Sequence, residues 1–152
     1  MEIDHNGLEI IGREECVLLL GRGRIGRLAL TSGALPFVVP VNFLLDGDQI
    51  VLRTSSGTKL ERAVDHAVVA FEVDEIDLIS HTGWSVVATG VAREVTDPAA
   101  LARLQLLPIP HWAPEGGDHF VTLSLDLLTG RRIPYGAARH DAIAQTGVSG
   151  AP

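Results

Sequence analysis

Hydrophobic and polar residues follow one another through most of the chain in short runs, and clusters of turn residues separate these runs. Runs rich in β-branched and aromatic residues between Gly, Pro, Asp and Ser are typical of strands. Those that predict strands are IGRLAL (25–30), FVVPVNFLL (37–45), IVLRT (50–54), VVAFEVDEI (68–76), GWSVVATGVAREV (83–95) and HFVTLSLDLL (119–128). The first three runs are joined by short turns and therefore predict an antiparallel meander.

For three of these strands the sequence allows a more specific prediction. The run over 68–76 is apolar enough to be buried on both faces. Gly90 predicts a bulge or bend in the run over 83–95. The run over 119–128 alternates, which predicts one half-buried strand. Its expected inward residues are Val121, Leu123, Leu125 and Leu127.

Helical signals are fewer and shorter. Residues 14–20 begin with two acids and end near glycines, as a short helix does. Residues 58–66 predict a second helix, with Thr58 and Glu61 as a capping box. Asp97 and Pro98 predict the start of a third, which runs to Pro108. About six strands and two or three helices, without strand–helix–strand alternation, predict a mainly β fold: an antiparallel barrel with peripheral helices.

Length and composition indicate one soluble, cytoplasmic domain. The 152 residues suit a single domain over 1–133, followed by an irregular tail over 134–152 that we expect to be flexible. No apolar run approaches the roughly 20 residues that span a bilayer, and the acidic N-terminus does not resemble a signal peptide. Cys16 is the only cysteine, which suits a reducing compartment. A net charge of −7 argues against nucleic acid as a partner.

Gly21, Gly23 and Gly26 satisfy the G-x-G-x-x-G pattern of dinucleotide-binding Rossmann folds. That fold requires a helix directly after the glycines. A helix there would have to run through Pro36 and Pro40, and each proline inside a helix costs roughly 3 kcal/mol. We therefore interpret the glycines as a bend between a helix and the first strand.

A better phosphate site lies at RTSSGTKL, residues 53–60, which joins a strand to a helix N-terminus. Arg53 and Lys59 supply positive charge there, and Lys59 is the only lysine of the chain. Hydroxyl groups of Thr54 and Ser55, together with the free N–H groups of the helix, would complete an anion site. An ordinary polar turn with a capping box explains the same residues, so both interpretations stay open.

No arrangement of other catalytic side chains stands out. The histidines lack metal-ligand spacing, so we expect no metal site, and no Ser-His-Asp order is evident. We expect the histidines, among them His119, to be structural or exposed.

Four stretches together resemble one family: GRLAL with VVPVNF, then LRTSSGTKL, VAFEVD and GWSVVATGVA. In order and spacing over residues 14–133 they are similar to the pyridoxamine 5'-phosphate oxidase-like, FMN-binding split-barrel proteins. The resemblance implies a six-stranded antiparallel split β-barrel that forms a homodimer, with FMN bound at the subunit interface.

The resemblance also implies a set of cofactor-binding residues. A phosphate-binding segment, a strand that passes the isoalloxazine ring, and a segment near the flavin from the second subunit would supply them. In that order they are Arg53, Thr54, Ser55, Lys59 and Leu60; Pro40, Val41 and Asn42; and Trp84 and Ser85. Asn42 could instead satisfy a strand end, and Trp84 could instead be a core residue.

The function implied is that of an FMN-dependent oxidoreductase acting on a small-molecule substrate or electron donor. Two alternatives stay open: a protein that binds flavin or haem without turnover, and a deazaflavin-dependent reductase whose cofactor tail meets the GRGRIGR loop. The chain ends in GRRIPYGAARH rather than in the basic and aromatic segment of the true oxidases, so oxidation of pyridoxamine phosphate is not expected. Arg131 and Arg132 could meet an anion or form a solvated strand end.

Overall fold

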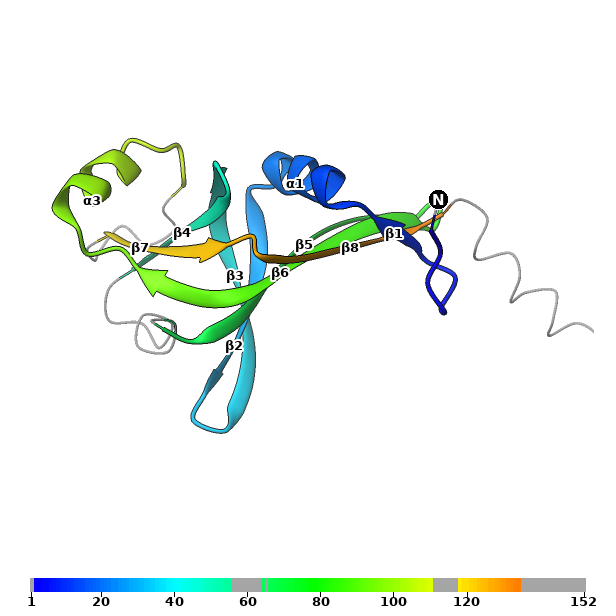
Figure 1. Cartoon of the computed structure of the whole chain (residues 1–152), viewed down its shortest axis with the longest axis horizontal. Helices are drawn as coiled ribbons and strands as arrows, with labels where there is room; N and C mark the ends of the chain where they lie inside the picture. The colour runs from blue at the N-terminus through cyan, green and yellow to red at the C-terminus, as the bar shows by residue number, and fades with distance from the viewer. Residues whose placement is uncertain (1, 56–63, 65, 111–117, 135–152) are drawn as a thin grey trace, which may run out of the picture.

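The computed structural model describes residues 2–55, 64, 66–110 and 118–134 (Figure 1). Strands dominate it, as the alternating runs predict. In chain order the elements are β1 (Glu9–Ile11), α1 (Arg13–Arg22), β2 (Ile25–Ser32), β3 (Leu35–Asp46), β4 (Gln49–Ser55), β5 (Val68–Asp77), β6 (Thr82–Glu94), α3 (Pro98–Leu104), β7 (Asp118–Ser124) and β8 (Leu127–Ile133).

Six of the strands close into an antiparallel barrel, which confirms the predicted fold class. Their order is β6-β5-β2-β3-β4-β7, and β7 pairs back onto β6. The first half of β6 pairs instead with β8, which in turn pairs with β1. These two strands and the adjoining ends of β6 and β5 run outward from the barrel, and we call this part the extension (Figure 1). The helix α1 lies along one face of the extension.

Two apolar clusters hold the strands together. The larger fills the barrel, where the Phe43 and Phe71 rings meet edge to face with centroids 4.8 Å apart. The smaller lies under α3 and consists of Val51, Leu104, Ile109 and Phe120. It buries the second face of β4 and β7, which is why Val51 and Leu52 are both buried although they point in opposite directions.

The prediction of one continuous strand over residues 119–128 is wrong. The run over 119–128 is broken after Ser124 into β7 and β8, where the backbone N–H of Leu125 donates to Asp48 O at 3.2 Å. β7 pairs with β4 and β8 pairs with β6, so the alternation does not continue through the break. Leu127, expected inward with Val121, is therefore 58% exposed. β8 ends at Ile133.

β5 also differs from its prediction, because only one of its faces is buried. Val69, Phe71 and Val73 point into the barrel, whereas Val68 on the other face is 71% exposed. β6 curves, as Figure 1 shows, and changes partner near Gly90, where Thr89 pairs with Leu127 and Ala92 with Leu123.

The starts of the described helices agree with their sequence signals, whereas α3 (Pro98–Leu104) ends before Pro108, to which it was predicted to run. α1 extends the predicted helix by one or two residues at each end. Asp97 is the N-cap of α3, and its carboxylate accepts from Ala100 N at 2.8 Å, as predicted. The predicted helix over 58–66 lies almost wholly outside the described residues. No helix in the described ranges has the length and apolar content needed to cross a membrane.

Candidate functional site

β3 and β4 place two groups of predicted site residues side by side. Asn42 and Arg53 are direct partners in the β3–β4 ladder, and Pro40 and Val41 precede Asn42 on β3. Arg53 Nη1 donates to Ile109 O at 2.8 Å, and its guanidinium lies 5.8 Å from the centroid of the Phe120 ring. Asn42 is 5% exposed, and its Nδ2 donates to Pro110 O at 2.9 Å. Both side chains thus hold the segment that follows α3.

The open edge of β3 begins at the same point. Residues 42–46 pair with β2 or β4, whereas residues 35–41 pair with β2 and with no other strand that the structure describes. Backbone groups along such an edge remain available to a ligand. Pro36 and Pro40, which lack an N–H donor, lie in this stretch, as prolines in sheets usually do. The edge therefore ends next to Arg53.

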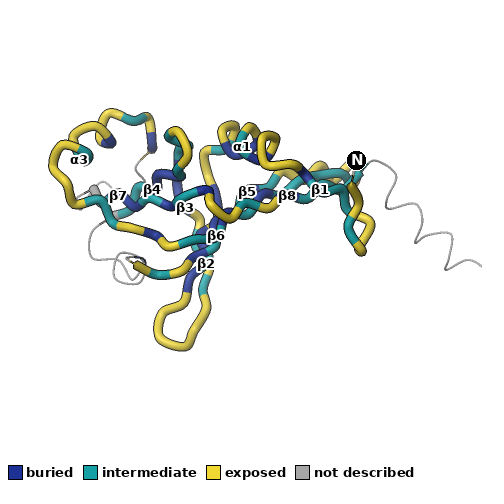
Figure 2. The backbone as a smooth tube through the Cα atoms, viewed as in Figure 1, coloured by how far each residue is buried: buried dark blue, intermediate teal, exposed yellow. Residues whose placement is uncertain are grey.

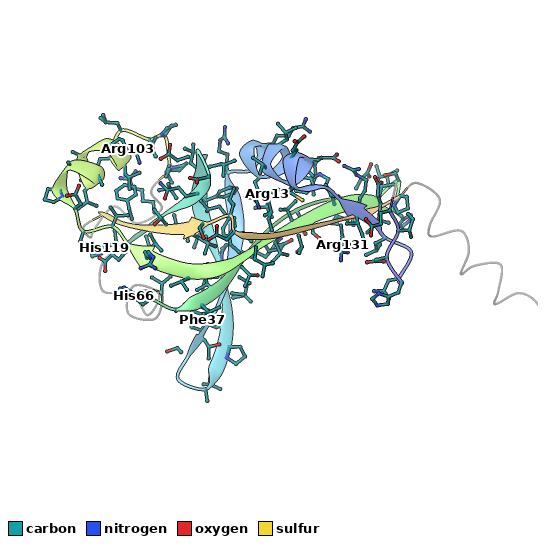
Figure 3. All side chains as sticks on the ribbon, viewed as in Figure 1. Arg13, Phe37, His66, Arg103, His119 and Arg131 are labelled. Carbon is teal, nitrogen blue, oxygen red and sulfur yellow. The ribbon has the colours of Figure 1, made fainter. Side chains whose placement is uncertain are left out.

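His119 lies next to the candidate site, a position that sequence reasoning did not predict. It is the cross-strand partner of Thr54 at the end of β7, and its Nδ1 lies 2.7 Å from Glu94 Oε1 on β6 (Figure 3). A carboxylate in this position fixes the orientation of the imidazole ring. The two residues are 25 positions apart in sequence, and only the β6–β7 closure brings them together. His119 is thus a neighbour of the predicted phosphate segment.

The rest of that segment lies beyond what is described. Lys59 and Leu60 are outside the described residues, and Ser55 is described only as the last residue of β4. The described residues contain no group of three or more metal-ligating side chains.

Trp84 and Ser85 lie elsewhere, on the extension. The strand order β6-β5-β2-β3 puts them three strands from Asn42. Trp84 packs partly against the main core and lies between Glu75 of β5 and Arg132 of β8. Within one chain, therefore, Trp84 and Ser85 do not join the residues of β3 and β4.

Arg131 and Arg132 fasten the N-terminal segment to β8. Arg131 Nε donates to Asp4 Oδ2 at 2.9 Å, far along the extension from His119 (Figure 3). Arg132 donates to Glu9 Oε1 at 3.3 Å and to Glu15 of α1. The hydrogen bond to Glu15 raises the pKa of Arg132 above its ordinary range. Both arginines therefore have a structural role.

The glycine pattern has the reverse of the Rossmann arrangement, as we expected. Gly21 lies in the last turn of the helix α1, Gly23 is its C-cap, and Gly26 lies in the strand β2 that follows. Arg24 Nη1 donates to the carbonyl oxygens of Gly21 and Gly23 at 3.2 and 2.8 Å, and Arg27 forms ion pairs with Glu72 and Asp74. These two arginines of the GRGRIGR loop thus have partners within the chain.

The donors at the end of β3 and β4 fit a planar heterocycle that carries a phosphate. An open strand edge can meet the polar rim of a ring, and the adjacent guanidinium can neutralise an anion. The described side chains of the site offer no evident nucleophile for covalent chemistry, so binding rather than covalent catalysis is the chemistry that suits them.

Comparisons with known proteins place the chain in a family and agree with the fold. The family model described as pyridoxamine 5'-phosphate oxidase matches residues 12–132. An uncharacterised protein of Mycobacterium tuberculosis is 39% identical over 128 residues, which cover 81% of this chain and 84% of that protein.

Solved structures show the same barrel. An FAD-binding protein from Mycobacterium smegmatis superposes with a TM-score of 0.75 at 35% identity, over 84% of this chain and all of that one. An FAD- and haem-binding protein from the same organism has a TM-score of 0.69 at 19% identity, over 93% of this chain and 85% of that one, which shows likeness of fold alone.

Proposed function

The chain belongs to the pyridoxamine 5'-phosphate oxidase family, and on this premise we propose that it is a flavin-dependent oxidoreductase that works as a cytoplasmic homodimer. FMN is the cofactor we expect from the sequence. The name of the solved relative from M. smegmatis makes FAD the second candidate. Both carry a phosphate next to the ribityl chain, so the same residues would serve either.

The observation that carries this proposal is the pairing of Asn42 with Arg53 at the place where the free edge of β3 begins. A bound flavin would supply hydride transfer. The chain's part is to bind and orient it: Arg53, Thr54, Ser55 and Lys59 hold the phosphate, and backbone groups of residues 40–42 meet the polar rim of the ring. Arg53 is held by Ile109 O and by the Phe120 ring, so its guanidinium is already oriented for an anion.

The visible spectrum of the purified protein tests the cofactor. We expect the two absorption bands of oxidised flavin, either as isolated or after addition of FMN or FAD, and bleaching of the longer-wavelength band when a reduced pyridine nucleotide is added without oxygen. A Soret band in place of the flavin bands would favour the haem-binding alternative. A deazaflavin spectrum would favour the deazaflavin-dependent reductase. A colourless protein that ignores all added flavins contradicts the proposal.

The homodimer rests on an exposed apolar face. The ladders place Val38, Ala29 and Ala70 in one row on the outer side of β3, β2 and β5. Val38 and Val68 are 61% and 71% exposed, and they line a hollow of about 390 Å³ with Pro36. In Figure 2 the exposed colour runs along the β2–β3 hairpin that borders this face. The sequence of β5 predicts a strand that is buried on both faces, whereas its outer face is exposed in a single chain. A second copy that covers this face would account for the difference.

A second copy would also complete the cofactor site. Trp84 and Ser85 are three strands away from Asn42 in one chain, and contact with a flavin at Arg53 would therefore come from the partner. The same outer face carries Arg27 beside Glu72 and Asp74, so charges of both signs are present for a self-complementary interface.

Charged substitutions on this face should separate the subunits. We expect Val38→Arg combined with Val68→Arg to weaken the dimer at least about tenfold, because each arginine would bring an unpaired charge into an apolar interface. Light scattering after size-exclusion chromatography measures the mass. Leu18→Arg, at a 65% exposed residue of α1, is the matched control and should remain dimeric. A wild-type chain that is monomeric at all concentrations contradicts the homodimer.

A further inference from the structure

The end of β7 places His119 beside the strand that begins the phosphate segment. His119 and Thr54 are direct partners in the β4–β7 ladder, so their side chains share the barrel side of the sheet. Val121, two residues further along β7 on that side, is buried in the barrel core. Arg53 points to the opposite side, where its guanidinium lies 5.8 Å from the centroid of the Phe120 ring. The end of β4 therefore has a basic side chain near each of its two faces.

Glu94 of β6 holds the His119 ring in place. Its Oε1 lies 2.7 Å from His119 Nδ1, and the two residues are diagonal neighbours across the ladder in which Glu94 pairs with Val121. Both side chains are largely shielded, with 29% of Glu94 and 26% of His119 exposed. Salt screens charges in such a position less than on an open surface. A charge on the pair is therefore felt by an anion at the neighbouring Thr54.

The charge of the His119–Glu94 pair depends on pH. A histidine side chain changes its charge between about pH 5 and 8, whereas a glutamate is ionised throughout that range. The pair is thus neutral when the imidazole is protonated and carries one negative charge when it is not. Arg53 and Arg93, on the outer faces of β4 and β6, keep their charge over this range. His66, whose backbone N–H donates to β6 at 2.9 Å, is the other described histidine at this end of the barrel (Figure 3).

We propose that the His119–Glu94 pair makes phosphate binding at the end of β4 depend on pH. A carboxylate repels a phosphate unless a cation neutralises it. With the imidazole protonated, the neutral pair leaves Arg53 and Thr54 to hold the anion, and after deprotonation the charge of Glu94 opposes it. Affinity for the phosphate therefore falls as the pH rises through the titration of His119. This inference rests on the proposed function, because the anion is the phosphate of the flavin.

The preference for FMN over riboflavin measures the phosphate contact, because only FMN carries the phosphate. Full-length apoprotein is titrated with each flavin at about pH 5.5 and about pH 8.5, on either side of the histidine range. The phosphate itself gains a charge at about pH 6, so every variant is compared with the wild type at the same pH. We expect His119→Gln to lower the preference about three- to tenfold at the lower pH, as the loss of one charge at a partly shielded site predicts. At the higher pH the variant should match the wild type.

Glu94→Gln distinguishes this charge effect from a structural one. The variant removes the negative charge and keeps the size of the side chain, so it should raise the preference for FMN about three- to tenfold at the higher pH. A purely structural brace would lower the preference in both variants. His66→Asn is the control, since asparagine tolerates the φ of 56° at this position, and it should leave the preference unchanged. The riboflavin affinity of each variant shows whether its fold is kept.

Three results overturn the inference while the proposed function stands. They are an unchanged preference in His119→Gln at the lower pH, an unchanged or lowered preference in Glu94→Gln at the higher pH, and a pH dependence that is lost in His66→Asn instead. Binding of neither flavin by the wild type contradicts the proposed function, and this inference with it.

Discussion

Replacing Gly26 with alanine should lower the free energy of unfolding by about 2 to 3 kcal/mol, the usual cost of overpacking a core. The methyl group would lie 2.6 Å from Phe71 Cε2 and 2.9 Å from the carbonyl oxygen of Glu72. The carbonyl belongs to the β2–β5 ladder and cannot move without loss of pairing. The Phe71 ring packs edge to face on Phe43 at the centre of the barrel, so it has little room to turn. Denaturant unfolding followed by circular dichroism measures the change.

Gly21→Ala is the matched control within the same glycine pattern. Gly21 lies in α1, and its new methyl group would be 3.8 Å from Leu45 Cδ2, an ordinary contact. Since alanine is favoured over glycine inside a helix by up to about 1 kcal/mol, this variant should be as stable as the wild type or more so. Equal losses at the two positions would mean that close packing is not what requires glycine at position 26.

Arg53→Ala should weaken the binding of FMN by about 1.5 to 3 kcal/mol, roughly 10- to 150-fold, because a charge-assisted hydrogen bond to the phosphate is lost. The guanidinium also holds Ile109 O and covers the Phe120 ring, so the variant should lose some stability as well. Lys59→Ala should weaken FMN to a similar degree. Fluorescence titration of the apoprotein measures the affinity, with FAD titrated in parallel.

Riboflavin separates the two effects of Arg53, because it lacks the phosphate. Its affinity should change much less than that of FMN if Arg53 acts through the phosphate. Arg103→Ala is the control variant: Arg103 is an exposed arginine of α3 that pairs with Asp46 at 2.7 Å, and its loss should leave both affinities unchanged. FMN binding that is unaffected by loss of Arg53 and of Lys59 would remove the phosphate assignment.

Much of the candidate site could be predicted because it depends on neighbouring residues. The Asp97–Pro98 helix start and the placement of Arg53 at the end of a strand follow from short-range preferences of the backbone. The exclusion of a Rossmann site follows in the same way, because prolines within twenty residues of the glycines rule out a helix. These statements need no knowledge of which strands pair.

His119 could not be found in that way. Its link to Glu94 exists only because β7 pairs with the last residues of β6. The break between β7 and β8 was missed for a related reason. Apolar and polar residues alternate without interruption from Val121 to Leu127, and the chain turns within this run because β7 and β8 have different partners.

The sequence by itself determined the barrel strands from β2 to β6, the N-cap of α3 and the polar segment at Arg53, since side-chain alternation, proline and glycine restrict the backbone over a few residues. Only the tertiary structure decided which strands close the barrel, that Asn42 lies opposite Arg53, and that Trp84 lies three strands away beside Glu75 and Arg132. Those contacts join residues far apart in the chain. Their formation depends on register and on competition among all the strands for partners, which no local pattern encodes.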